Sequence, residues 1–347
     1  MTAANAFTAR IVHSTSLTGP ELARWRALQA SNPTLISPFF APEFAQGFTA
    51  AGHAVQVVLI KIEGTLIGVL PFEKGGLARA GATDRVMRLL GAGCPAGRRL
   101  SDHHGLIAAP EFVPDAFGLL RAAQLTTWDF HRLPTTQATF APFKTHSEDW
   151  HIADLSGGHE HYLASVRKTS SSILKQTAMK ERRLVRAVGP LTYKSNLRDP
   201  RLLASLLEWR SLRHPHAPDL DGLTKTELEA LLTHFLSIDT PDFAGQLSGL
   251  FAGDQIVALH FGLRSRKLLV YWFLGFNPAF AQISPGISLL LRLIEQAGRD
   301  GIQQIDLGAG SERYKRQLST STTQLFAGSV ERRSILRGYR ALKHRLK

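Results

Sequence analysis

The stretch "SPGISLLLRLIEQAGRDGIQQIDLGAGSERYKRQL" (residues 284–318) decides the fold, because a helix, a strand and a glycine turn follow one another in it. Ser284 before Pro285 is a typical helix start, and the apolar spacing predicts a helix over 285–299. Gly286 falls in its first turn, where glycine disfavours a helix unless something approaches the backbone closely. Free amides at a helix N-terminus can bind an anion, so this start is either an anion site or a plain cap.

The second half of the stretch predicts a strand over 302–307 that carries Asp306 to its end. Gly308 and Gly310 then let the chain turn tightly. A dinucleotide fingerprint is excluded because Arg313 stands where its third glycine belongs, and a Walker A loop is excluded because no Gly-Lys-Ser/Thr follows. We therefore interpret the turn as a strand end that directs Asp306, Tyr314 and Lys315 toward one region. The alternative is an ordinary turn with solvated charges.

The rest of the chain repeats this organisation. Residues 54–72 and 247–261 both predict a β-hairpin, and four matched positions are separated by 189 residues throughout: Gly64 and Gly253, Ile67 and Ile256, Leu70 and Leu259, and Phe72 and Phe261. A helix and a strand follow each hairpin, at 117–133 and at 287–308. We predict a mixed α/β (α+β) fold with two copies of one module, at 1–150 and 151–330, and a helical tail at 331–347.

Basic residues are concentrated in two segments. The net charge is +13, and residues 167–186 and 331–347 each hold seven Lys or Arg and one Glu, a net +6. Either these are solvated helix faces, or they contact a polyanion such as a nucleotide-bearing substrate, tRNA or an anionic membrane surface. In the tail, Ile335, Leu336, Tyr339 and Leu342 recur at helical spacing, so we expect a basic amphipathic helix there.

Other features narrow the class of protein. No apolar run approaches the roughly 18 residues that span a bilayer, and Cys94 is the only cysteine. We expect a cytoplasmic protein, with peripheral membrane attachment as an alternative. The clusters "SDHHG" (101–105) and "HPH" (214–216) lack zinc-site spacing, so no metal site is expected. His260 and Tyr271 lie on predicted strands, where each is either a core residue or a catalytic one.

The order of hairpin, third strand, helix with an early glycine, and strand resembles the Gcn5-related N-acetyltransferase (GNAT) core. Four motifs resemble one branch, the CelD-like acetyltransferases associated with cellulose biosynthesis. They are "SPG" (284–286), "IDLGAGSERYKRQLS" (305–319), "ISPFF" (36–40) and "WHIADLSGGHEHYL" (150–163). That family is related to the Fem-type peptidyltransferases, which carry two GNAT-like modules per chain.

The resemblance implies an acyl-CoA-dependent N-acyltransferase with acetyl-CoA as the expected donor and the second module as the catalytic one. The pyrophosphate would bind at Ser284, Gly286, Ile287 and Ser288, and an amine of a sugar or lipid-linked envelope or exopolysaccharide precursor would attack the thioester. The candidate catalytic groups are His260 or Asp306 as base, Tyr271 or Tyr314 as acid, and Lys315 as a contact for an anionic substrate group. Two alternatives stay open: a Fem-like aminoacyl-tRNA-dependent transferase, and a non-catalytic GNAT-like partner of a polysaccharide-synthesis complex.

Overall fold

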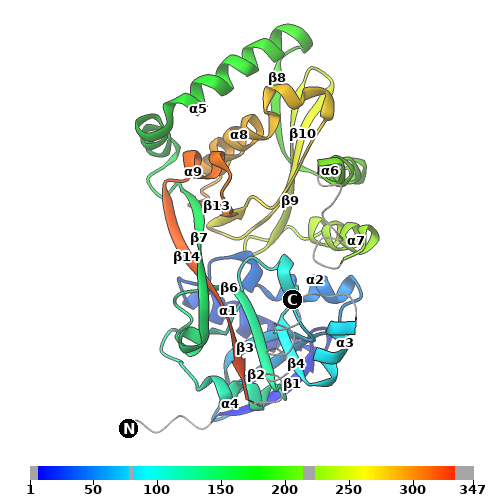
Figure 1. The fold of residues 1–347 in the computed structure, drawn as a ribbon, viewed down its shortest axis with the longest axis vertical. Coiled ribbons are helices and arrows are strands. Elements are labelled where there is room, and N and C mark those ends of the chain that lie inside the picture. The colour runs from blue at the N-terminus through cyan, green and yellow to red at the C-terminus, as the bar shows by residue number, and fades with distance from the viewer. Residues whose placement is uncertain (1–6, 78–81, 214–222, 333–347) are drawn as a thin grey trace, which may run out of the picture. The chain divides into compact units, whose positions relative to one another are not determined.

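The computed structural model describes residues 7–77, 82–213 and 223–332 (Figure 1). It divides into two compact units. Unit 1 contains the described residues of 7–148, 223–227 and 324–332, and unit 2 contains those of 149–213 and 228–323. The helix predicted for the tail lies outside the described residues. None of the helices in the described ranges combines the length and hydropathy that crossing a membrane requires.

Unit 1 has a sheet in the order β1-β2-β3-β4-β6-β14, with the short β5 added to β3. The strands are β1 (Thr8–His13), β2 (Val55–Ile62), β3 (Thr65–Lys74), β4 (Ala92–Pro95), β5 (Ile107–Ala108), β6 (Thr127–Pro134) and β14 (Ser321–Glu331). The helices are α1 (Gly19–Ser31), α2 (Pro42–Ala50), α3 (Ala82–Leu89) and α4 (Ala116–Ala122). A buried core around Trp128, Phe130 and Phe140 joins α4 to the sheet.

Unit 2 has a sheet in the order β7-β13-β11-β10-β9-β8, with β12 added to β10. The strands are β7 (Lys144–Asp154), β8 (Leu191–Leu197), β9 (Ala244–Ala252), β10 (Gln255–Arg264), β11 (Leu268–Val270), β12 (Phe273–Phe276) and β13 (Gln304–Ala309). The helices are α5 (His159–Val188), α6 (Pro200–Arg213), α7 (Lys225–Leu236), α8 (Pro285–Arg299) and α9 (Arg313–Leu318). Leu290, Leu293 and Ile294 of α8 pack with Tyr162 and Val166 of α5 in the core of this unit.

The two sheets confirm the repeat that the sequence predicts. In each, an antiparallel hairpin (β2–β3 or β9–β10) leads to a short strand that pairs in parallel with the strand after the next helix, β4 with β6 and β11 with β13. Each module also includes an exchanged strand. The strand β7, which follows β6 in the chain, pairs with β13, whereas β14, which follows β13, pairs with β6. The chain therefore has two GNAT-like modules in tandem, each a mostly antiparallel mixed sheet with helices against it.

Local sequence explains the starts and turns of these elements. Thr18 and Glu21 form the predicted capping box of α1, with both reciprocal bonds present. The first hairpin turns at Glu63 and Gly64, which have φ values of 48° and 79°. A right-handed strand twist favours such turns, and glycine accepts the positive φ without strain.

Two strand predictions need correction. The strand predicted over 267–275 is broken between β11 and β12, because β11 pairs with β13 whereas β12 pairs with β10. The strand predicted over 302–307 begins at Gln304 and continues to Ala309. Its pairing with β7 continues past Asp306 through a bulge, so the turn begins later than the glycines suggested. The predicted domain limits at 150 and 330 stay a prediction.

Candidate active site

The N-terminus of α8 lies where two strands of unit 2 diverge. β11 runs parallel to β13 up to the pair of Val270 and Asp306, and β12 then pairs with β10 instead. Among the described strands, β12 has no second neighbour. The 3-10 turn over Pro278–Ile283 leads from β12 into α8. The helix therefore begins beside an edge of β12 that pairs with no other described strand.

Ser284 precedes α8 as predicted, but it does not cap the helix. Its φ of 56° and ψ of 55° are left-handed, and its side chain accepts no bond from the first turn. A capping side chain requires extended backbone at this position, which explains the difference. The Ser284 hydroxyl instead accepts a hydrogen bond at 2.7 Å from Lys180 Nζ of α5. The predicted helix start with Ser284 as its N-cap residue is confirmed, and the alternative of plain side-chain capping is not supported.

Gly286 allows close packing between α8 and β12. A Cβ at this position would lie 2.7 Å from Leu274 Cδ2, closer than van der Waals contact. The Gly286 carbonyl also accepts a hydrogen bond at 3.2 Å from the Tyr271 hydroxyl. Ile287 is half-buried against the core, and Ser288 is 1% exposed with no partner for Oγ among the described groups. The close approach inferred from this glycine is thus made by the sheet, and anion binding by residues 284–288 stays a prediction.

Lys180 makes the start of α8 electropositive. The helix dipole places partial positive charge at this end, where a cation is unfavourable unless an anion accompanies it. Lys180 is half-buried and forms no ion pair within the described chain, and the neighbouring Glu181 pairs with Arg292 at 3.0 Å. An ammonium beside helical amides is suited to a phosphate. Sequence reasoning missed Lys180 because nothing local connects it to Ser284.

The corresponding helix in unit 1 begins differently. The N-cap of α4 is Asp115, whose carboxylate accepts a bond at 2.7 Å from the Gly118 amide. This carboxylate occupies the place of an anionic ligand and would repel one. The two modules therefore share a topology but differ in charge at the equivalent helix start.

His260 lies in a fully buried polar stack on the sheet. Its ring is 4.6 Å from that of Tyr271 at an interplanar angle of 11°, and its Nδ1 is 3.3 Å from Ser248 Oγ. Burial lowers the pKa of His260 to about 3, against an opposing contribution from the Val270 backbone. The imidazole is therefore neutral near pH 7, but at 0% exposure it has no direct access to a substrate in this conformation. Its role as a base stays a prediction.

Asp306 holds the end of β13 together. The side chain is 0% exposed, and its Oδ1 accepts bonds from Trp150 Nε1 at 2.6 Å and from the Gly308 amide at 2.8 Å. The indole of Trp150, which lies on β7, was not foreseen. The Asp306 carbonyl also accepts from the Tyr271 amide at 2.8 Å, so Tyr271 joins this turn to the stack and to α8.

Lys315 closes over the turn that follows β13. Its ammonium donates to the Ala309 carbonyl and lies 3.5 Å from Glu312 Oε2. His151 lies on the other side of the same turn, with Nε2 3.2 Å from the Gly310 carbonyl. Tyr314 is half-buried and packs against the core. The structure thus brings Asp306 and Lys315 to one turn, as expected, and adds His151, which the sequence did not single out.

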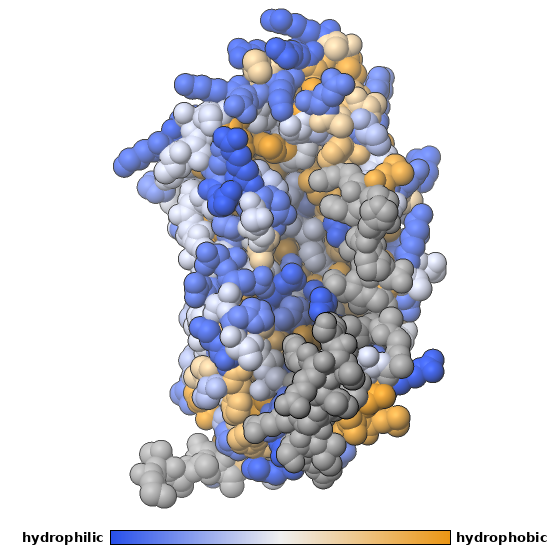
Figure 2. Space-filling view, in the orientation of Figure 1, coloured by the Kyte–Doolittle hydropathy of each residue, from blue (hydrophilic) through white to orange (hydrophobic). Residues whose placement is uncertain are grey.

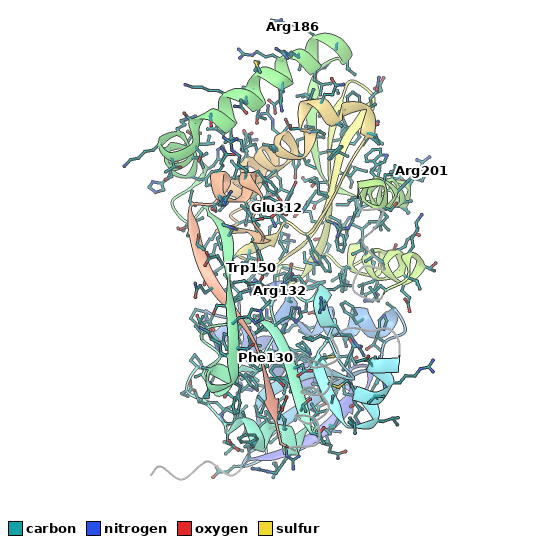
Figure 3. The ribbon with its side chains drawn as sticks, in the orientation of Figure 1. Phe130, Arg132, Trp150, Arg186, Arg201 and Glu312 are labelled. Atoms are coloured by element: carbon teal, nitrogen blue, oxygen red, sulfur yellow. The ribbon has the colours of Figure 1, made fainter. Side chains whose placement is uncertain are left out.

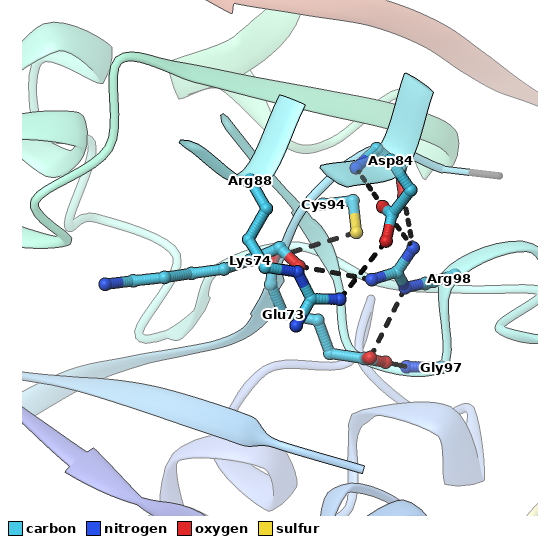
Figure 4. Close-up of polar contacts among 8 residues, drawn as sticks. Glu73, Lys74, Asp84, Arg88, Cys94, Gly97 and Arg98 are labelled. Atoms are coloured by element: carbon cyan, nitrogen blue, oxygen red, sulfur yellow. Dashed lines mark hydrogen bonds and ion pairs between the residues drawn. The ribbon is translucent and has the colours of Figure 1, made fainter. Parts of the chain in front are cut away.

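Unit 1 contains a buried cluster of charged residues around Arg98 that stabilises the fold (Figure 4). Arg98 is 2% exposed and donates to Asp84 Oδ1 at 2.9 Å and to Glu73 Oε2 at 3.3 Å. The Gly97 amide donates to Glu73 Oε1 at 3.0 Å. Burial alone would raise the pKa of Asp84, but hydrogen bonds from Arg98 and Gly76 lower it overall. In the described ranges no three potential metal ligands of the His, Cys, Asp and Glu types lie together.

Comparison with known proteins gives a family match within unit 2. Residues 172–316 match the family described as the acetyltransferase (GNAT) domain. This match covers most of unit 2 and supports a GNAT fold for it. No curated protein sequence matches this chain significantly.

Solved structures resemble the whole chain at low identity. A structure of FemX is 10% identical with a TM-score of 0.62, covering 96% of this chain and 99% of that one. A conserved protein of unknown function from Bacteroides thetaiotaomicron is 11% identical with a TM-score of 0.54, covering 89% and 97%. The C-terminal DUF2156 domain of a candidate lysylphosphatidylglycerol synthetase from Agrobacterium fabrum is 10% identical with a TM-score of 0.53, covering 92% and 95%. These likenesses concern the fold, and the candidate site rests on the residues described above.

Proposed function

We propose that this chain is an acyl-CoA-dependent N-acyltransferase whose catalytic module is unit 2. The observation that carries the proposal is the start of α8 within a matched GNAT domain. Three features lie together there: a helix N-terminus without a side-chain cap, the Lys180 ammonium, and the edge of β12 that pairs with no other described strand. In this proposal the pyrophosphate of acyl-CoA binds at residues 284–288 and Lys180 neutralises part of its charge. The carboxylate of Asp115 at the equivalent helix of unit 1 supports the assignment to unit 2 alone.

The reaction requires an amine to attack the thioester carbonyl while a base takes its proton. A backbone amide of β12 would stabilise the oxyanion, and a phenol would protonate the leaving thiolate. Tyr271 is one candidate phenol, because its ring links the His260 stack to Gly286. Lys315 and His151 flank the turn after β13 and would contact the acceptor.

The proposed acceptor is an amino sugar or a lipid-linked envelope or exopolysaccharide precursor. This finer proposal is supported by the resemblance of residues 284–286 and 305–319 to CelD-like acetyltransferases. Acetyl-CoA is the proposed donor on the same ground. A Fem-like transfer from aminoacyl-tRNA and a non-catalytic role both predict that acyl-CoA species do not bind.

The test is a titration of the protein with acetyl-CoA, with tRNA as the competing ligand. We expect acetyl-CoA to bind and Gly286→Asp to weaken its binding by about tenfold or more, because the new carboxylate faces the pyrophosphate. Gly286→Ala is the matched control, since it adds the same contact with Leu274 without the charge. Equal affinities for the Asp and Ala variants would show that the phosphates bind elsewhere. Binding of aminoacyl-tRNA without acetyl-CoA would instead favour the Fem-like reaction.

A further inference from the structure

The second half of α5 presents a cationic face to solvent. The helix is kinked at Ser170, whose φ of −145° and ψ of 38° are not helical, and it then continues to Val188. Its exposed cations beyond the kink are Lys175, Arg182, Arg183 and Arg186. Arg182 and Arg186 form no ion pair with a described residue, whereas Arg201 and Arg266 pair with Asp199 and Asp242. The side chain of Arg186 extends away from the ribbon at the end of the helix (Figure 3).

Apolar side chains lie among these cations. Met179 and Val185 are 40% and 41% exposed, and they are two of only five large hydrophobic residues that are exposed in the described part of the chain. A groove of about 560 Å³ runs beside them between α5, β8 and α8. Apolar residues of the helix and of the chain after it line this groove, together with three arginines and one glutamate: Ala178, Val185, Pro190 and Leu191, with Arg182, Arg186, Arg292 and Glu181. Glu181 is paired with Arg292, so Arg182 and Arg186 remain the uncompensated charges of the lining. Figure 2 shows hydrophilic side chains over most of α5 and an apolar patch beside its end.

We propose that this face of α5 docks on the surface of an anionic lipid bilayer. Arg182 and Arg186 would contact lipid phosphates, while Met179 and Val185 would enter the interface between headgroups and acyl chains. The uncompensated cations supply the charge complementarity. The exposed apolar residues favour lipid over nucleic acid, because a phosphate backbone offers them no apolar contact.

The composition of the helix supports the same choice. Residues 171–188 contain no Phe, Tyr or Trp, so this face offers no aromatic platform for base stacking. Long basic side chains that flank shorter apolar ones suit an interface in which charges stay at headgroup level. The docking proposal is independent of the acyl-transfer proposal, since none of its residues lies at the start of α8.

The experiment is flotation of the full chain with phosphatidylcholine vesicles, with and without about 30% phosphatidylglycerol. We expect binding to the anionic vesicles that falls as salt is raised from about 0.1 M to 0.5 M. Arg182→Gln/Arg186→Gln should lower the vesicle partition coefficient about 25-fold, at roughly fivefold per charge. Arg201→Gln/Arg266→Gln, which removes two exposed charges elsewhere in the same unit, is the matched control and should change it less than about twofold.

A third variant separates lipid from polyanion. Met179→Ser/Val185→Ser should weaken binding to anionic vesicles several-fold while leaving binding to tRNA unchanged, because it keeps every charge. Absence of vesicle binding, or equal losses for the Arg182/Arg186 and Arg201/Arg266 variants, would overturn the proposal. It would also be overturned if the Met179/Val185 variant bound vesicles like the wild type while the Arg182/Arg186 variant lost tRNA, which would identify this face as a nucleic-acid surface. Circular dichroism of each variant shows that the fold is retained.

Discussion

Substitution of Asp306 separates a catalytic role from a structural one. The bonds that its side chain accepts from Trp150 Nε1 and from the Gly308 amide end on the same oxygen, Oδ1. Asp306→Asn retains an acceptor oxygen there and removes the charge, whereas Asp306→Ala leaves both donors without it. An unsatisfied buried donor costs about 1–3 kcal/mol, so the Ala variant should lose about 2–6 kcal/mol of unfolding free energy. The Asn variant should lose about 1–3 kcal/mol, because neutral acceptors are weaker than charged ones.

The assays are urea unfolding and release of the CoA thiol from acetyl-CoA with a panel of amino sugars. Because Asp306 is 0% exposed, we expect the Asn variant to keep thiol release within about tenfold of the wild type. Removal of a true general base would instead cost about 10²–10⁴-fold. A loss of that size in the Asn variant, with stability and acetyl-CoA affinity retained, would refute our reasoning and identify Asp306 as the base.

Trp150→Phe provides the control for this series. It removes one of the two donors to Asp306 and retains an aromatic ring, so alone it should cost about 1–2 kcal/mol. In the Asp306→Ala background its hydrogen-bond contribution is already absent, and the added cost should be close to zero. Fully additive losses would show that the bond between these side chains contributes little.

Three further predictions follow from the described contacts. Lys315→Ala should reduce acyl transfer while leaving acetyl-CoA affinity within about twofold, because its ammonium lies at the turn after β13 and not at α8. Equal losses of acyl transfer and of acetyl-CoA affinity would show that Lys315 contacts the coenzyme. Because burial lowers the pKa of His260, the unfolded state binds one more proton than the folded state between about pH 6.5 and 3. The free energy of unfolding should therefore fall with decreasing pH by up to about 1.4 kcal/mol per pH unit from this residue. In urea unfolding of His260→Gln, the free energy of unfolding should depend less steeply on pH by that amount. Arg98→Met should cost about 3–5 kcal/mol near pH 7 by leaving Glu73 and Asp84 without their cation. Because hydrogen bonds from Arg98 and Gly76 lower the pKa of Asp84 in the folded state, part of this loss should disappear as the pH falls through that lowered pKa. An equal loss at neutral and acid pH in urea unfolding would contradict the ion-pair explanation.

Two parts of the candidate site illustrate what could be foreseen. The start of α8 was predicted because proline and glycine act on their own backbone, within a few residues. The partner of Ser284 was not, because Lys180 lies 104 residues away in the chain. Similarly, the turn at Gly308 and Gly310 was predicted from glycine itself, whereas the bond from Trp150 to Asp306 spans 156 residues. The only sequence signal for the bond between Trp150 and Asp306 would have been the Trp-His pair on a strand, with a buried acid expected opposite it.

The sequence by itself determined the local elements of this protein and their repeated order. Alternating apolar residues and glycine turns fixed the two hairpins, and caps and apolar periodicity fixed most helix limits, because these interactions connect neighbours in the chain. Only the tertiary structure decided that β7 and β14 are exchanged between the two modules, that β11 and β12 part at Tyr271, and that Lys180 meets α8. These features depend on pairings between distant segments, in which several strands could satisfy the same local pattern. Packing selects among them, since one register buries the apolar face and satisfies the polar groups together.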